Sequence, residues 1–506
     1  MKKYIKIIAV TALSSMMLPS CSSDFLDVEP EGLTVESNYY RNEAEAFAGL
    51  ASVYDLMRKN SGGFENMITM FNAGSDDHYA GGGGASDGAG IQSFSNYTIN
   101  VNTVPDSFFS DYYRGIYRAN VLLSKLPSVP MNETTKARYA AEARVLRAYY
   151  YFNLVRMFKN VPLILQPLSG SEFYSVTQAD PADVYEQIEL DITESINALP
   201  MTLNPSNEGG RLSQGSARAI LGKVYLYQGK NTLAAAQFAE VNGTPGGISQ
   251  YGYSLEDNFA DLWNVSNRHN SESILEVTHS SQGSYWGIWG GNADEGNTVN
   301  VMVGPRNYVK VNAAAPDLPS GWSFNVFTQD FIDFMQGDPR FEATVFDIHP
   351  YEDFAQSQNP NSHAYIGGYQ DTGYFLNKFL PRQSDVYSGP GDAVLNYKQN
   401  TYAIRLADTY LMEAEALGGS GARAQALLDA VRARVGLPSV PVSMTAIKNE
   451  RRRELAGEGH RWFDLVRWGD APTVLGPRGF VAGKHEILPI PFRELDGTQL
   501  VQNPNY

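Results

Sequence analysis

The sequence predicts a mostly α-helical protein, in which tetratricopeptide-like helix pairs form an α–α superhelical scaffold with long loop-rich insertions and a few short strands. Three observations support this fold class. Apolar residues recur at helical spacing between Phe47 and Leu199. One later segment has the residue spacing of a tetratricopeptide helix pair. No comparable series of alternating apolar and polar residues, the pattern of half-buried strands, appears along the chain.

The amino terminus has the pattern of a cleaved export signal, which we assign to residues 1–20. Three lysines precede a short apolar stretch, and Leu18-Pro19-Ser20 then leads to Cys21. The stretch is too short to cross a bilayer in the mature protein. Cys21 is the single cysteine of the chain, and its position after Leu and small residues resembles a bacterial lipobox. We therefore expect Cys21 to carry a lipid. Pro19 is an unusual lipobox residue, and the alternative is a secreted protein in which Cys21 is incidental.

Residues 21–35 are predicted to form a lipidated tether, and residues 36–506 a single domain. Several acyl chains on one terminus attach a protein stably to a membrane, where a single chain binds only marginally. No later stretch approaches eighteen apolar residues, so the lipid is the only membrane attachment that the sequence predicts. The formal net charge of −16 repels phosphate backbones, and we expect no nucleic acid partner.

Four amphipathic helices are predicted in the first 200 or so residues. Asn42 and Glu45 have the spacing of a capping box at the start of the first, and the third, rich in Ala and Arg, spans about residues 135–158. Asp180 as cap and Pro181 at the first helical position open the fourth. The apolar faces of the first, second and fourth helices are Phe47, Leu50, Ala51, Tyr54 and Met57; Phe109, Tyr112, Ile116, Ala119, Leu123 and Leu126; and Val184, Ile188, Ile192 and Leu199.

The tetratricopeptide spacing lies in Leu221-Gly222-x-x-Tyr225 followed by Ala234-x-x-x-Phe238. Small residues stand where two antiparallel helices would touch, and large residues fill the remaining space. Gly229 would end the first helix of the pair. A second, more degenerate pair is predicted at residues 405–416 and 422–434. The alternative is an ordinary helical hairpin.

The chain changes character between residues 242 and 400, where Gly, Asn, Ser, Pro and aromatic residues dominate. Helical periodicity fades there, and Ser273 to His279 is the one plausible short strand. Loops this long are usually functional or disordered, and the abundant Trp and Tyr argue against disorder. We therefore divide the domain into a helical part (36–241), a loop-rich part (242–400) and a carboxy-terminal helical part (401–506).

Motifs for catalysis are missing from the sequence. There is no His-Glu-x-x-His, no Gly-x-Ser-x-Gly and no phosphate loop, and the run Gly81 to Gly84 lacks the residues that would hold a phosphate. Asp76 and Asp77 with Asp87 have ligand chemistry for calcium, but their spacing fits no calcium loop. We therefore expect no enzymatic activity, no cofactor and no metal.

Two aromatic-rich loops have the composition of a sugar-binding surface. Pyranose rings have apolar faces and hydroxyl rims, which suit flat aromatic rings and planar polar groups. Tyr285 and Tyr308 lie in the second of these loops. The predicted ligand-binding residues are Asp76, Asp77, Tyr79, Asn96 and Tyr97 in the first loop, and Trp286, Trp289, Arg306 and Trp322 in the second. The alternative for any single aromatic residue is packing within its loop.

A set of sequence stretches, spread over nearly the whole mature chain, has a specific order and spacing. The most specific is Glu450-Arg-Arg-Arg-Glu-Leu455 followed by Glu458-Gly-His-Arg-Trp-Phe-Asp-Leu465 and Arg467-Trp-Gly469. The others are Asp24 to Asp27, Tyr112 to Asn120, Ala141 to Tyr150, Arg211 to Ser213, Leu428 to Arg434, Leu488 to Pro491 and Asn503 to Tyr506. In these stretches the chain resembles the SusD/RagB family of Bacteroidetes surface lipoproteins.

The resemblance implies four tetratricopeptide-like helix pairs, a glycan site built from loops, and association with a TonB-dependent outer-membrane transporter of the SusC type. It also implies a lipid-anchored protein at the cell surface. The carboxy-terminal motif has a structural interpretation, in which Glu450, Arg453, Glu454 and Arg461 form ion pairs beneath Trp462 and Trp468. Many relatives carry Trp where this chain has Phe109, so a contact made by that Trp would be altered here.

Three classes of function remain. The first is capture of oligosaccharides or polysaccharides for a transporter, with peptides or another nutrient in place of glycans as a variant. The second is a lipid-anchored glycoside hydrolase, which would need a carboxylate pair across an open cleft. The third is a scaffold that binds only protein. The resemblance favours glycan capture, and the sequence does not identify the glycan.

Overall fold

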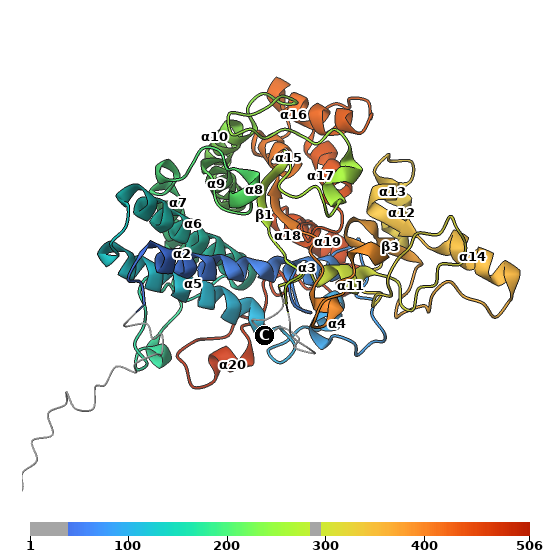
Figure 1. The fold of residues 1–506 in the computed structure, drawn as a ribbon, viewed down its shortest axis with the longest axis horizontal. Helices are drawn as coiled ribbons and strands as arrows, with labels where there is room; N and C mark the ends of the chain where they lie inside the picture. Colours follow the sequence, from blue (N-terminus) through green and yellow to red (C-terminus); the bar gives the residue numbers. More distant parts are fainter. Residues whose placement is uncertain (1–38, 284–294) are drawn as a thin grey trace, which may run out of the picture.

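The computed structural model describes residues 39–283 and 295–506, and its helices follow one another in a curved row (Figure 1). A first group packs along the amino-terminal half, and α9 and α10 lead from it to the carboxy-terminal group. This arrangement confirms the mostly α-helical fold. The long helices of the row are α2 (Glu43–Tyr54), α5 (Ser107–Lys125), α6 (Glu133–Phe158), α7 (Pro181–Thr193), α9 (Gln214–Tyr227), α10 (Asn231–Asn242), α15 (Leu406–Ala416), α16 (Gly421–Arg434) and α17 (Met444–Glu454).

The predicted tetratricopeptide pair is formed by α9 and α10, with a close contact at its smallest residue. A Cβ atom on Gly222 would lie 2.7 Å from Cε1 of Phe238, so only glycine permits this approach. Gly229 ends the first helix at a φ of 70°, in the left-handed region that glycine tolerates. The second predicted pair is α15 and α16, which pack together, and α15 also packs against α10. Both pairs are confirmed.

The predicted helix starts are confirmed at two positions. The side chain of Asn42 accepts a hydrogen bond from the Glu45 amide, and that of Asp180 accepts one from the Ala182 amide. The predicted apolar face of α2 is partly wrong. Leu50 is buried, but Phe47 and Ala51 are exposed, because the helix turns Ala46, Gly49, Leu50 and Val53 toward its neighbours.

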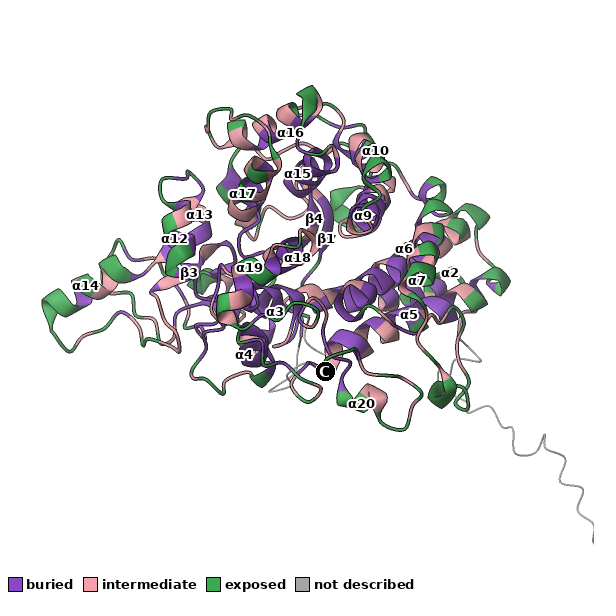
Figure 2. Cartoon of the chain, turned by 180° about the vertical axis from the view of Figure 1, so that it is seen from behind, coloured by how far each residue is buried: buried purple, intermediate pink, exposed green. Residues whose placement is uncertain are grey.

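The middle of the chain contains short elements that the sequence pattern did not indicate. Its helices are α11 (Val299–Val303), α12 (Gln329–Met335), α13 (Phe341–Thr344) and α14 (His349–Gln358). The predicted strand is β1 (Ser273–Val277), which pairs antiparallel with β4 (Thr401–Arg405), and β2 (Val345–Asp347) pairs with β3 (Tyr374–Leu376). In α14 only Ala355 is buried, and this helix projects from the body (Figures 1 and 2). The three-part division of the domain remains a prediction.

A network of buried ion pairs lies behind the carboxy-terminal motif. Glu454 contacts Arg340 at 2.8 Å and Arg405 at 2.6 Å, and Glu450 contacts Arg340 and Arg432 at 2.7 Å each. Arg434 also pairs with Glu454. Burial alone would raise the pKa of Glu454, but these arginines hold it well below its ordinary value. The four predicted residues therefore form ion pairs, but with partners from other segments of the chain.

In the described ranges, no helix is both long and apolar enough to cross a membrane.

Candidate functional site

The two loops that carry the predicted ligand-binding residues lie side by side. The backbone of residues 77–82 runs antiparallel to that of residues 323–328, with hydrogen bonds from Thr328 N to Asp77 O (2.9 Å), Tyr79 N to Val326 O (2.9 Å), Asn325 N to Ala80 O (3.0 Å) and Gly82 N to Ser323 O (2.8 Å). We call this pairing the loop ladder. It brings the glycine run next to Trp322.

Glycines permit the close approach at the end of the loop ladder. A Cβ atom on Gly81 would lie 2.2 Å from the carbonyl oxygen of Ser323, and one on Gly82 would lie 2.6 Å from the ring of Phe324. Both glycines also have φ values in the left-handed region. The glycine run therefore allows the two backbones to approach closely beside the candidate site, although it lacks residues that would bind a phosphate.

Trp322, Arg306 and Asp87 form the polar and aromatic group at this end of the loop ladder, which we call the platform. Arg306 Nη1 donates to the carbonyl of Trp322 at 3.1 Å and lies 3.8 Å from Asp87 Oδ2. The Gly83 amide donates to the same carboxylate oxygen at 2.7 Å. The side chains of Arg306 and Asp87 are 35% and 40% exposed, so both reach solvent while their positions are fixed. Arg306 therefore contacts the backbone of Trp322, and an indole from the same segment as planar charged groups suits a sugar face and its hydroxyls.

Two platform neighbours were not predicted as ligand-binding residues. Phe64 packs beside Trp322 with 6.3 Å between ring centroids, and the amide of the half-buried Tyr369 donates to Gly82 O at 2.8 Å. Both lie far from the platform loops in sequence, so no local pattern marks them. The sequence indicates Asp87 only as a residue with ligand chemistry for calcium. Its contact with Arg306 joins two loops that are distant in sequence, so no local pattern predicts it.

Asp76 and Asp77, both predicted to bind ligand, are held by arginines of the carboxy-terminal motif. Arg461 donates two hydrogen bonds to Asp76 at 2.8 Å each, and Arg452 Nε donates to Asp77 Oδ1 at 2.7 Å. Burial would raise the pKa of Asp76, but Arg461 and Arg452 hold it below its ordinary value. Asp77 is 1% exposed, and burial raises its pKa despite Arg452. These carboxylates serve internal ion pairs and are not on the platform.

The three remaining candidate residues of the first loop differ in their exposure. Tyr97 is 5% exposed and packs against Phe480 and His485, so its ring has no face available to a sugar, and we withdraw it from the site. Tyr79 is half-buried, with the Arg478 guanidinium 5.6 Å from its ring. Asn96 is exposed.

Trp286, Trp289 and Tyr285 lie outside the described residues, as does Cys21. Their assignment to the glycan site and to lipidation stays a prediction. Within the described ranges, no group of three or more His, Cys, Asp or Glu side chains has an arrangement that could hold a metal ion.

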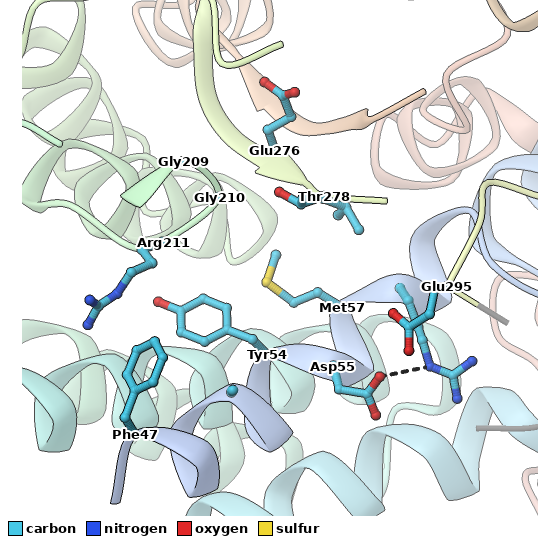
Figure 3. Close-up of a pocket in the computed structure, with 13 residues that line it drawn as sticks. Phe47, Tyr54, Asp55, Met57, Gly209, Gly210, Arg211, Glu276, Thr278 and Glu295 are labelled. Atoms are coloured by element: carbon cyan, nitrogen blue, oxygen red, sulfur yellow. Dashed lines mark ion pairs between the residues drawn. The ribbon is translucent and has the colours of Figure 1, made fainter. Parts of the chain in front are cut away.

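A separate cavity of about 260 Å³ lies between α2 and the end of β1 (Figure 3). Phe47, Tyr54 and Met57 line one side, and Arg211, Glu276 and Thr278 line the opposite side. Buried Glu142 fixes part of this wall by accepting hydrogen bonds from Arg211 and from the Tyr54 hydroxyl. Sequence reasoning placed Phe47 and Tyr54 in the core and missed the cavity, because the loop that closes it comes from residues 209–211.

Two family models match the chain. The model described as the SusD family matches residues 271–479, and the one described as starch-binding associating with outer membrane matches residues 24–226. A SusD-like protein of Formosa agariphila is 25% identical over 94% of each chain.

Solved structures agree in fold. A laminarin-binding SusD-like protein is 64% identical, with a TM-score of 0.89 over 92% of this chain and 100% of the other. Surface glycan-binding protein A from Bacteroides fluxus is 26% identical, with a TM-score of 0.79 over 92% of this chain and 100% of the other.

Proposed function

Because the chain belongs to the SusD family, we propose that it captures a glycan at the outer membrane and delivers it to a TonB-dependent transporter of the SusC type. The observation that carries this proposal is the 64% identity to a laminarin-binding protein along the full length of that protein. Laminarin is a β-linked glucan, and we propose this class of polysaccharide as the ligand. The starch-binding description of the second family model supports a glucan as well.

We place the glycan at the platform of Trp322, Arg306 and Asp87. Stacking of a sugar ring on an indole combines apolar contact with few rotatable bonds. The guanidinium of Arg306 and the carboxylate of Asp87 would donate to and accept from hydroxyl groups at the rim of the ring. Their mutual contact and the Gly83 amide hold both groups in place before the ligand arrives, which lowers the entropy cost of binding. Trp286 and Trp289 are retained as further stacking residues from the sequence.

Binding without turnover is part of the proposal. The two similar proteins of solved structure are described as laminarin-binding and as surface glycan-binding, which supports a binding role. At the platform, the carboxylate of Asp87 lies 3.8 Å from the guanidinium of Arg306, a pairing suited to binding hydroxyl groups. Laminarin incubated with the protein should therefore keep its chain length. Release of reducing ends that one Asp or Glu substitution abolishes would refute this part.

Attachment through Cys21 to the outer leaflet of the outer membrane completes the proposal. The lone cysteine after a signal sequence supports it. A Cys21→Ser variant should leave the membrane fraction and lose incorporation of labelled palmitate. Persistence of both in the variant would contradict the anchor.

The binding site is tested with Trp322→Ala, measured by affinity electrophoresis and calorimetry on laminarin and, in parallel, on soluble starch. Loss of one stacking contact worth roughly 1–2 kcal/mol should weaken laminarin binding about tenfold or more. The matched control is Trp468→Phe, because Trp468 is also half-buried but donates to Glu415, away from the platform. Normal binding by Trp322→Ala, or equal loss in both variants, would remove the platform from the proposal.

A further inference from the structure

The carboxy-terminal motif reaches the amino-terminal half of the protein through arginine side chains at one end of the loop ladder. Arg461 contacts Asp76 through Nε and Nη2, and Arg452 contacts Asp77 through Nε and Asp76 through Nη2 at 3.2 Å. These pairs join residues 375 or more positions apart. Arg478 adds hydrogen bonds to the carbonyl of His78 at 2.8 Å and to Ser95 Oγ at 2.7 Å.

The two arginines are themselves fixed. The guanidinium of Arg452 lies 4.5 Å from the ring of Phe334, and the side chains of Arg452 and Arg461 are each 15% exposed. Removing Arg461 would take two hydrogen bonds from half-buried Asp76 and leave it the 3.2 Å contact with Arg452, and removing Arg452 would take the ion pair from buried Asp77. Such a carboxylate is unfavourable in a low-dielectric interior, so the segment would move to hydrate it.

The loop ladder connects this anchored end to the platform. Thr328 bonds to both residues of the anchored pair, through its amide to Asp77 O and its hydroxyl to Asp76 O. The pairing then continues to Ser323, the residue after Trp322. Thr328 at the anchored end and Trp322 at the platform belong to the same short segment of the chain. A change in the pairing of these two segments would move Ser323 and, with it, the adjacent Trp322.

We propose that Arg452 and Arg461 are positioning residues for glycan binding, which set the register of the loop ladder and thereby the placement of Trp322 and Arg306. They touch no ligand. This inference rests on the proposed function, because it requires that the platform binds the glycan. It assigns to the family's most specific sequence motif a role in ligand affinity, in addition to the ion-pair network behind that motif.

The test compares Arg461→Gln with Arg467→Gln. Arg467 is a comparably buried arginine of the same motif that pairs with Glu415 and Asp464 and has no contact with the loop ladder among the described residues. Laminarin affinity is measured by calorimetry, and amide hydrogen exchange is followed for the peptides covering residues 76–88 and 322–328. Arg461→Gln should weaken binding about tenfold and speed exchange in both peptides. Arg467→Gln should lower the melting temperature without either effect.

A double variant separates positioning from general destabilisation. Asp76→Asn combined with Arg461→Gln removes the carboxylate that has lost its two hydrogen bonds from Arg461 and leaves two amides that can bond to each other, so it should recover part of the affinity. Unchanged affinity in Arg461→Gln, or weaker binding without faster exchange in the ladder peptides, would overturn the inference. If Trp322→Ala also binds normally, the proposed site fails as well. If Trp322→Ala loses binding while Arg461→Gln does not, the positioning role alone fails.

Discussion

Trp322 and Trp462 show how burial divides the roles of chemically identical side chains. Trp322 is half-buried beside Phe64, with charged groups that reach solvent nearby. Trp462 is fully buried, with ring centroids 5.1 Å from both Phe71 and Phe463. The sequence allowed this distinction to be predicted, because one indole lies in a Gly-rich loop and the other in a dense helical motif. Which side chains each tryptophan contacts was visible only in the structure.

Replacing Trp462 with alanine should destabilise the protein without a direct effect on the site. The change opens a large cavity in the core, for which we expect a loss of about 3–5 kcal/mol in the free energy of unfolding. Denaturant melts measure this loss, and calorimetry at low temperature measures laminarin affinity in the folded fraction. Normal melts with lost affinity would contradict the assignment of Trp462 to the core.

Buried histidines should make stability depend on pH below neutrality. Burial lowers the pKa of His78 to about 3 and that of His279 to about 4, while an unfolded chain binds these protons near pH 6.5. The unfolded state therefore holds more protons between about pH 6.5 and pH 4, and the free energy of unfolding falls as the pH falls through this window.

His279→Gln tests this linkage directly. The ring of His279 contacts Ser61 Oγ and the Glu295 carbonyl, and the glutamine amide can replace one of these hydrogen bonds. Denaturant melts between pH 7 and pH 4 should show a dependence on pH that is shallower by about one proton than in the parent protein. An unchanged slope would mean that His279 does not titrate on unfolding.

Helix pairs depend on small residues at points of contact, and α9 with α10 is the clearest case. The small-to-large spacing made this pair predictable from the sequence, as did the caps Asn42 and Asp180, because both signals are local. The loop ladder was not predictable, since it pairs residues 77–82 with residues 323–328 without a strand pattern in either. The apolar face of α2 was predicted only in part for a related reason. Phe47 and Ala51 of this helix line a cavity that residues 209–211 close, and no local pattern in the sequence indicates that contact.

Gly222→Ala tests the helix contact. The new Cβ atom would lie 2.7 Å from the Phe238 ring, and overpacking of this kind costs about 1–3 kcal/mol. Thermal melts should show the loss, and combining the change with Phe238→Leu should restore part of it by removing ring atoms. Equal stability of Gly222→Ala and the parent protein would show that the helices can separate at no cost.

At the scale of the whole molecule, distant segments meet through ion pairs. The structural interpretation of the carboxy-terminal motif correctly predicts that it forms ion pairs, but not that Arg461 pairs with Asp76, a residue that the sequence assigns to the ligand site. No pattern of charges along an acidic chain identifies which carboxylate an arginine will reach 385 residues away. The fold class was predictable from the sequence, whereas the contacts that hold the two loops together were not.

A crystal structure of the protein with laminarihexaose tests most directly whether the platform of Trp322, Arg306 and Asp87 binds a β-linked glucan. We expect glucose units to stack on Trp322, with hydroxyl groups within hydrogen-bond distance of Arg306 or Asp87 and the chain of the ligand intact. Glucose units confined to the cavity between α2 and β1, with an unoccupied platform, would contradict the assignment of the glycan site to the platform.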